Sequence, residues 1–233
     1  MIIIGDVHGC YKTLIELIKQ LPENEQICFV GDIIDRGKDS YKVVEYIIKN
    51  NHLCVLGNHE QMMIDSQGEN NYMTQNWIKQ GGLETLNSYP KIFNLQEKKL
   101  EIDNLKINEH LNYFKTLPLY IEQKFDGYKN LIISHSFIID KIDEYKLKII
   151  DFNEKEDILW NRKVLLKKFV DMDEKNYFNV FGHTIMKEEL LTENFAAIDT
   201  GAFLNKFDYI KEGDLTAIQY PSLKIFKQKS LEN

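Results

Sequence analysis

Three apolar segments of this 233-residue chain end on glycine followed by a short side chain that carries oxygen. The endings repeat at a constant interval of 26 residues and are Gly5-Asp6, Gly31-Asp32 and Gly57-Asn58. That interval accommodates one strand, one crossover helix and their turns, so it predicts successive parallel strands. Parallel strands bring their carboxyl ends to one edge of a sheet, where open α/β sheets form their sites. We therefore expect Asp6, Asp32 and Asn58 to lie side by side.

The first part of the chain has the apolar pattern of a βαβαβα unit. Its expected strands cover 1–5, 27–31 and 53–57. Its expected helices lie near 11–21 and 40–50, and a third opens near Gln61. Residues 67–117 are more polar, with apolar positions at helical spacing, so we expect a helical insertion that caps the sheet.

A second block of strands follows the insertion. Residues 120–125 and 130–134 form an expected hairpin, because Asp126-Gly127 between them is typical of a tight turn. Further strands are expected at 178–182, 195–199, 215–220 and 223–227. The charged segment 137–176 is expected to be helix and loop. We find no linker or repeat, and we expect residues 1–233 to form a single domain.

Composition and charge exclude some classes of protein. The formal net charge of −7 argues against a nucleic-acid groove, which normally needs a basic face. It remains compatible with an anionic substrate, because bound divalent ions would supply local positive charge. The three cysteines are widely separated, which indicates no disulfide framework and favours a reducing compartment. No apolar run approaches membrane-spanning length, so we expect a cytoplasmic protein; its oligomeric state stays open.

Four of the six histidines occur beside these strand ends. His8 and His59 accompany the first block, and His135 and His183 end strands of the second. Asp, Asn and His clustered at the mouth of a sheet indicate a metal centre. The remaining histidines, His52 and His110, lack such neighbours, and we expect no functional role for them.

The motifs in chain order are Gly5-Asp6-Val7-His8-Gly9, Gly31-Asp32-Ile33-Ile34-Asp35-Arg36-Gly37, Gly57-Asn58-His59-Glu60, Ser134-His135 and Gly182-His183-Thr184. This set resembles the calcineurin-like metallophosphoesterases, and the Asp-Arg-Gly element resembles their phosphoprotein phosphatase branch. Trp160-Asn161-Arg162 and Asp199-Thr200-Gly201 look like stretches of bacteriophage members of that branch. The resemblance implies an α/β fold of two facing mixed β-sheets flanked by helices, with a dinuclear metal site at the strand ends.

The resemblance also implies a role for each motif residue. Asp32, on the central strand of the three, would bridge two divalent metal ions. The implied ligands are Asp6, His8, Asp32, Asn58, His135 and His183. Nitrogen and oxygen ligands without thiolate suit Mn²⁺, Fe or Zn²⁺, and family precedent favours manganese.

Substrate binding and proton transfer follow the same resemblance. Arg36 and Arg162 would bind the phosphate, because guanidinium groups contact phosphate oxygens in pairs. His59 would be the general acid, oriented by Asp35. A metal-bridging hydroxide would attack phosphorus directly in line, without a phosphoenzyme.

The implied activity is metal-dependent hydrolysis of phosphate monoesters on a phosphoprotein or phosphopeptide, at Ser or Thr and with Tyr left open. The alternative is a symmetrical bis(5'-nucleosyl)-tetraphosphatase. A non-catalytic scaffold is disfavoured, because all six candidate ligands and His59 are present.

Two assignments keep a second interpretation, and two further residues carry separate expectations. Arg162 could instead anchor a loop. Asp199 could support a metal-bound histidine or cap a turn. Glu60 is expected at the start of a helix, where an acidic side chain interacts favourably with the helix dipole. Phe137 stands where the resembling phosphatases often have an acidic or glycine residue, and it is expected to alter the rim of the site.

Overall fold

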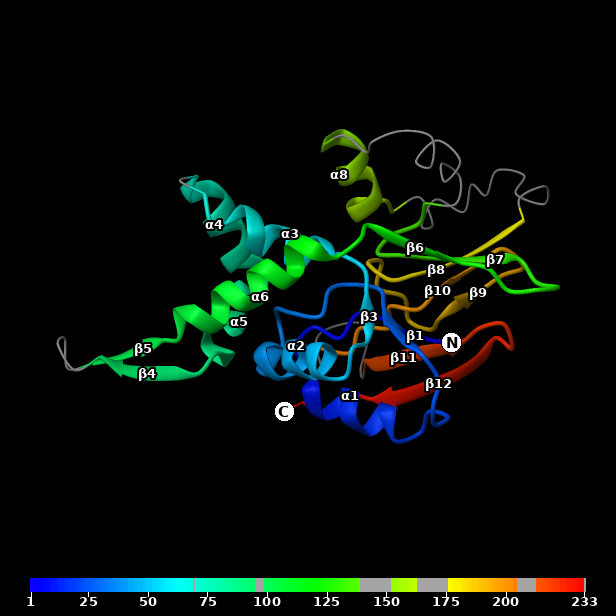
Figure 1. Cartoon of the computed structure of the whole chain (residues 1–233), viewed down its shortest axis with the longest axis horizontal. Helices are drawn as coiled ribbons and strands as arrows, with labels where there is room; N and C mark the ends of the chain where they lie inside the picture. The colour runs from blue at the N-terminus through cyan, green and yellow to red at the C-terminus, as the bar shows by residue number, and fades with distance from the viewer. Residues whose placement is uncertain (69, 95–98, 139–151, 163–175, 205–212, 233) are drawn as a thin grey trace.

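The computed structural model describes residues 1–68, 70–94, 99–138, 152–162, 176–204 and 213–232. Two five-stranded mixed sheets face each other, with helices packed outside them (Figure 1). This is the α/β architecture of facing mixed sheets that the sequence predicts. No helix among the described residues combines the length and the apolar character needed to cross a membrane.

The first sheet has the order β12-β11-β1-β2-β3. Its parallel strands are β1 (Ile2–Ile4), β2 (Ile27–Phe29) and β3 (Leu53–Cys54). The crossover helices are α1 (Tyr11–Ile18) and α2 (Ser40–Lys49), so the predicted βαβαβ order is confirmed. β11 (Asp214–Gln219) runs antiparallel to β1, and β12 (Lys224–Lys229) forms the edge.

The second sheet has the order β6-β7-β8-β10-β9. β6 (Tyr120–Gln123) and β7 (Asn130–Ser134) form the predicted antiparallel hairpin. β8 (Tyr177–Phe181) and β10 (Phe195–Ala197) also lie where strands were expected. The two-residue β9 (Leu190–Leu191) is too short to give a periodic signal and was not predicted. Within 137–176 the structure contains α8 (Phe152–Trp160), and residues 139–151 and 163–175 lie outside the described residues.

Alternation along the first strands explains why two layers pack on this sheet. Ile2 and Ile4 of β1 face the cluster that contains helix residues such as Leu14 and Val43. Ile3, between them, belongs to the cluster that the two sheets share. Successive side chains of a strand point to opposite faces, so one apolar run covers both surfaces.

The segment 67–117 contains helices and also a pair of strands. The elements are α4 (Asn71–Trp77), the segment η1 (Ile78–Gly82), which is kinked at Gly81, α5 (Leu83–Ser88), β4 (Lys91–Asn94), β5 (Lys99–Ile102) and α6 (Asn104–Thr116). The β4–β5 ribbon, which projects at one end of the molecule in Figure 1, was not expected. Strands of four residues outside the main sheets give too short a pattern to be recognised.

Candidate metal centre

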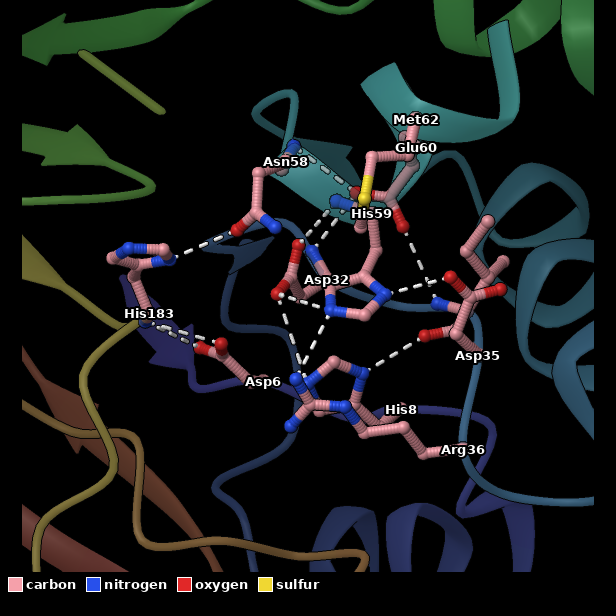
Figure 2. A network of polar contacts seen from close by, with 12 residues as sticks. Asp6, His8, Asp32, Asp35, Arg36, Asn58, His59, Glu60, Met62 and His183 are labelled. Carbon is pink, nitrogen blue, oxygen red and sulfur yellow. Dashed lines mark hydrogen bonds and ion pairs between the residues drawn. The ribbon is translucent and has the colours of Figure 1, made fainter. Parts of the chain in front are cut away.

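The candidate ligands all occur directly after strands, at one edge of the paired sheets. Asp6 follows β1, Asp32 follows β2, and Asn58 begins α3 (Asn58–Asp65) after β3. His135 and His183 follow β7 and β8 of the second sheet. The structure brings these side chains together in a buried group, most of which Figure 2 shows. The parallel topology therefore has the geometric consequence expected from the 26-residue interval.

One half of the group is formed by Asn58, His135 and His183. The Oδ1 atom of Asn58 lies 2.7 Å from His135 Nε2 and 2.8 Å from His183 Nδ1. His135 Nδ1 lies 2.9 Å from the carbonyl oxygen of Val30, so it carries the hydrogen and donates. The lone pair of His135 Nε2 therefore faces the lone pairs of Asn58 Oδ1. A cation between these atoms would satisfy both.

The other half contains His8 and Asp32. His8 Nδ1 lies 2.9 Å from the carbonyl oxygen of Ile34, which leaves a lone pair on Nε2. That Nε2 lies 3.7 Å from Asp32 Oδ2, while Asp32 Oδ1 lies 3.4 Å from His135 Nε2. Asp32 thus faces both halves at once, as a bridging carboxylate must.

Two compact clusters of possible ligand atoms share Asp32. They are His8–Asp32–His59 and Asp32–His135–His183, and within each the ligand atoms lie within 4.8 Å of one another. Asp6 belongs to neither cluster. Its carboxylate accepts the backbone N–H of His183, with distances of 3.1 and 3.3 Å to its two oxygens (Figure 2).

The electrostatics of the group also favour cations. Burial, with the charges of Asp199 and Asp32, raises the pKa of Asp6 well above its ordinary value. Burial lowers the pKa of His8 and His135, and it lowers that of His183 to about 2. Neutral imidazoles are the form that binds metal, and clustered carboxylates need compensating positive charge. The residues present therefore fit a pair of divalent ions.

The backbone of these loops adopts strained conformations. His8, Asp32 and His183 have φ values of 46°, 48° and 64°, in the left-handed region that disfavours residues with a Cβ atom. Such conformations concentrate at functional sites, where the surrounding structure holds them. Gly182 is required for a different reason: a Cβ atom there would lie 1.8 Å from Asp6 Oδ1. The motif glycines therefore make room for the carboxylates.

Glu60 holds the ligand loops in place, a role that its position at a helix start did not reveal. Its buried carboxylate accepts backbone N–H groups at 2.9–3.3 Å; the donors are Asp32, Ile33, Ile34 and Gly57. Burial and the charge of Asp32 raise the pKa of Glu60 to about 8, whereas the backbone bonds oppose this rise. The only sequence signal was a glutamate three residues after the helix N-cap.

We expect Glu60→Ala to lower the free energy of unfolding by at least about 3 kcal/mol, because it leaves buried amide groups without acceptors. Glu60→Gln should have a smaller effect, since one acceptor oxygen remains. Urea unfolding of the metal-free protein measures both. Glu16→Ala, on an exposed face, is the control and should change stability by less than about 0.5 kcal/mol. Equal stability of Glu60→Ala and the unmodified protein would contradict this role.

His59 lies between two charged groups beside the candidate metal centre. Its Nδ1 atom is 2.6 Å from Asp35 Oδ2, and its Nε2 atom is 3.1 Å from Arg36 Nη2 (Figure 2). Because a carboxylate accepts and a guanidinium donates, this arrangement is a neutral imidazole with its hydrogen on Nδ1. Burial lowers the pKa of His59, but the charges of Asp32 and Asp35 outweigh it and raise the pKa above its ordinary value.

A cleft of about 150 Å³ opens onto this group. Both candidate phosphate-binding arginines line it, together with Gln80 of η1 and Trp160 of α8. The Arg36 guanidinium lies 4.4 Å from the centre of the Phe203 ring. Arg162 Nη1 donates to the carbonyl oxygen of His183 at 3.2 Å, so it reaches the cleft and also anchors the loop.

The surroundings of Phe137 and Asp199 bear on two further expectations. Phe137 does not line the cleft: it is buried against Phe181 and Phe195, with ring centres 5.5 Å away in both cases. The expectation that it alters the rim was wrong, because the side chain points into the second sheet's own core. Asp199 accepts the Gly201 N–H at 3.0 Å, which is the turn-capping alternative.

The strand-end group, the facing sheets and the cleft fit the class of metal-dependent phosphoesterases. The chain matches the calcineurin-like phosphoesterase family over residues 1–215 and belongs to it. It is a hydrolase acting on phosphate esters, from a family that uses a dinuclear divalent metal centre.

Relatives named for two different activities are about equally similar to it. It is 29% identical to serine/threonine-protein phosphatase 2 of Salmonella typhimurium, with 86% of this chain and 87% of the relative covered. It is 28% identical to the symmetrical bis(5'-nucleosyl)-tetraphosphatase of Wigglesworthia glossinidia brevipalpis, with 98% of both chains covered. The crystal structure of a metallophosphoesterase from Sphaerobacter thermophilus superposes with a TM-score of 0.54 at 14% identity, covering 100% of this chain and 90% of that one. The last likeness concerns the fold alone.

Proposed function

We propose that this protein is a phosphomonoesterase that acts on phosphoserine and phosphothreonine in proteins. The observation that carries the proposal is the buried His59–Asp35 pair, placed beside Arg36 at the cleft. An alkoxide is a poor leaving group, so a serine or threonine phosphate needs a proton donor. A phosphoanhydride has a better leaving group and depends less on such a donor.

The candidate ligands are Asp6, His8 and the bridging Asp32 on one side, and Asn58, His135 and His183 on the other. Two bound ions, for which we propose Mn²⁺, would act as Lewis acids toward the phosphate and activate the attacking water. Residues 1–233 would form one domain, and residues 67–117 would be an insertion within it.

The chain's own charged residues bind and orient the substrate. Arg36 and Arg162 supply guanidinium groups that match a phosphate dianion. In the observed geometry Arg36 donates to His59 Nε2. A bound phosphate would draw Arg36 away, so that Nε2 could take up a proton from water and then pass it to the oxygen of the leaving group. Asp35 keeps Nδ1 bonded during that transfer.

The second candidate function is hydrolysis of symmetrical dinucleoside tetraphosphates. This function is favoured by the symmetrical bis(5'-nucleosyl)-tetraphosphatase described above, whose alignment covers 98% of this chain. A comparison of kcat/KM on a phosphoserine peptide and on diadenosine tetraphosphate, with Mn²⁺-loaded protein, distinguishes the two. We expect preference for the peptide. Preference for the dinucleotide would replace the first proposal by the second.

A further inference from the structure

Side chains of the inserted segment surround the carboxylate of Asp35 from the side opposite His59. Trp77 Nε1 donates to Asp35 Oδ2 at 2.9 Å and lies 3.1 Å from Oδ1. Thr85 Oγ1 donates to Asp35 Oδ1 at 2.6 Å. Trp77, at the end of α4, and Thr85, in α5, are themselves buried. Asp35 therefore receives hydrogen bonds at both oxygens while it faces His59 Nδ1.

The segment η1 between these two residues, which is kinked at Gly81, fits closely against the same motif. The carbonyl oxygen of Gly81 accepts the backbone N–H of Arg36 at 3.3 Å. A Cβ atom on Gly81 would lie 2.6 Å from that nitrogen, and one on Gly82 would lie 2.5 Å from the Trp77 indole. Gly81 also has a φ of 109°, which a residue with a Cβ atom rarely adopts. The glycine pair thus allows the segment to approach Asp35 and Arg36 closely.

We infer that Trp77 and Thr85 are positioning residues for the reaction, acting on the leaving group through Asp35 and His59. This inference rests on the proposed function, because it assumes that His59 donates a proton. A carboxylate held at both oxygens cannot rotate about its Cβ–Cγ bond without losing a charge-assisted hydrogen bond. Its Oδ2 atom stays opposite His59 Nδ1, and the imidazole ring stays aimed with Nε2 toward the cleft. In this way residues distant in sequence complete the catalytic pair.

Two substrates with different leaving groups distinguish a defect in the positioning of His59 from a defect in substrate binding or in attack on phosphorus. Release of nitrophenolate from p-nitrophenyl phosphate needs little protonation, whereas release of serine alkoxide from a peptide needs it. We expect Trp77→Phe and Thr85→Val each to lower kcat on a phosphoserine peptide by about 10-fold, with KM little changed, because each removes one hydrogen bond to a charged group. On p-nitrophenyl phosphate the change should stay below about 2-fold, since binding and attack are unaffected.

Two controls complete the experiment. Thr85→Ser retains the hydroxyl group and should retain the peptide activity. In the His59→Ala background, Trp77→Phe should have no further effect on the peptide, because residues acting through one another are not additive. A readout independent of activity is the Nδ1-bound proton of His59 in the NMR spectrum of the metal-free protein. It should exchange faster with water in Trp77→Phe and Thr85→Val, and remain protected in Thr85→Ser.

The outcomes distinguish this inference from the proposed function. If His59→Ala selectively lowers peptide turnover but folded Trp77→Phe and Thr85→Val lower both substrates equally, or neither, the positioning role is wrong. If His59→Ala itself lowers both substrates equally, the general-acid role fails, and the inference fails with it. If Trp77→Phe does not fold, the pair Thr85→Val and Thr85→Ser decides alone.

Discussion

Replacement of His59 by alanine is expected to lower kcat on a phosphoserine peptide by about 10²–10⁴-fold, the usual contribution of a general acid. The physical reason is the poor leaving group, which must depart as an alcohol. The ring nitrogens of His59 contact Asp35 and Arg36, so its loss should leave the candidate metal ligands in place. Steady-state kinetics with Mn²⁺-loaded protein measures the change, and p-nitrophenyl phosphate should respond much less.

His52→Ala is the matched control, because His52 is a partly exposed histidine that lies outside the cleft. Its activity should equal that of the unmodified protein. The metal content of His59→Ala should remain unchanged when measured by elemental analysis. A loss of bound Mn²⁺ would assign His59 to the metal centre instead, as its place in one of the compact clusters allows.

Asp32→Asn is expected to lower activity on every substrate by about 10³-fold or more, because metal ions contribute several kcal/mol to such reactions and each 1.36 kcal/mol is a factor of ten. Asp32 is shared by both ligand clusters, and its Oδ1 atom accepts the His59 backbone N–H at 3.0 Å. An amide can neither neutralise two cations nor bridge them equally. Elemental analysis should find fewer than two Mn²⁺ ions per chain.

The control for this change is Asp39→Asn, which removes a carboxylate paired with the exposed Lys42 and should leave metal content and activity intact. Addition of Mn²⁺ should raise the melting temperature of Asp39→Asn, because ligands that bind only the folded state stabilise it. The same addition should raise the melting temperature of Asp32→Asn much less. Two tightly bound ions in Asp32→Asn would contradict the bridging role.

The interpretation of the candidate site depends on neighbours as much as on ligands. Glu60 joins the loops after β2 and β3 through backbone hydrogen bonds, so it fixes Asp32 relative to Asn58. Three of the candidate ligands, His8, Asp32 and His183, have left-handed backbone conformations, which are stable only when the surroundings hold them. A ligand set of this kind is therefore a property of the whole sheet edge.

The amino-acid sequence by itself determined the order of the βαβαβ unit, the hairpin at Asp126-Gly127 and the strand-end positions of the candidate ligands. These features depend on local pattern: apolar alternation, glycine at turns, and a constant interval that parallel topology converts into proximity. Short elements such as β9 and the β4–β5 ribbon were not predicted, because strands of two to four residues give too short an apolar pattern.

Only the tertiary structure decided which side chains support the candidate site. Trp77 and Thr85 are 42 and 50 residues from Asp35 in the chain, and nothing in their own sequence surroundings indicates a carboxylate partner. Phe137 follows a motif histidine and yet packs into the core of the second sheet. Such contacts depend on how helices and sheets pack together, because burial and hydrogen bonding between distant segments are settled by the folded chain and not by local spacing.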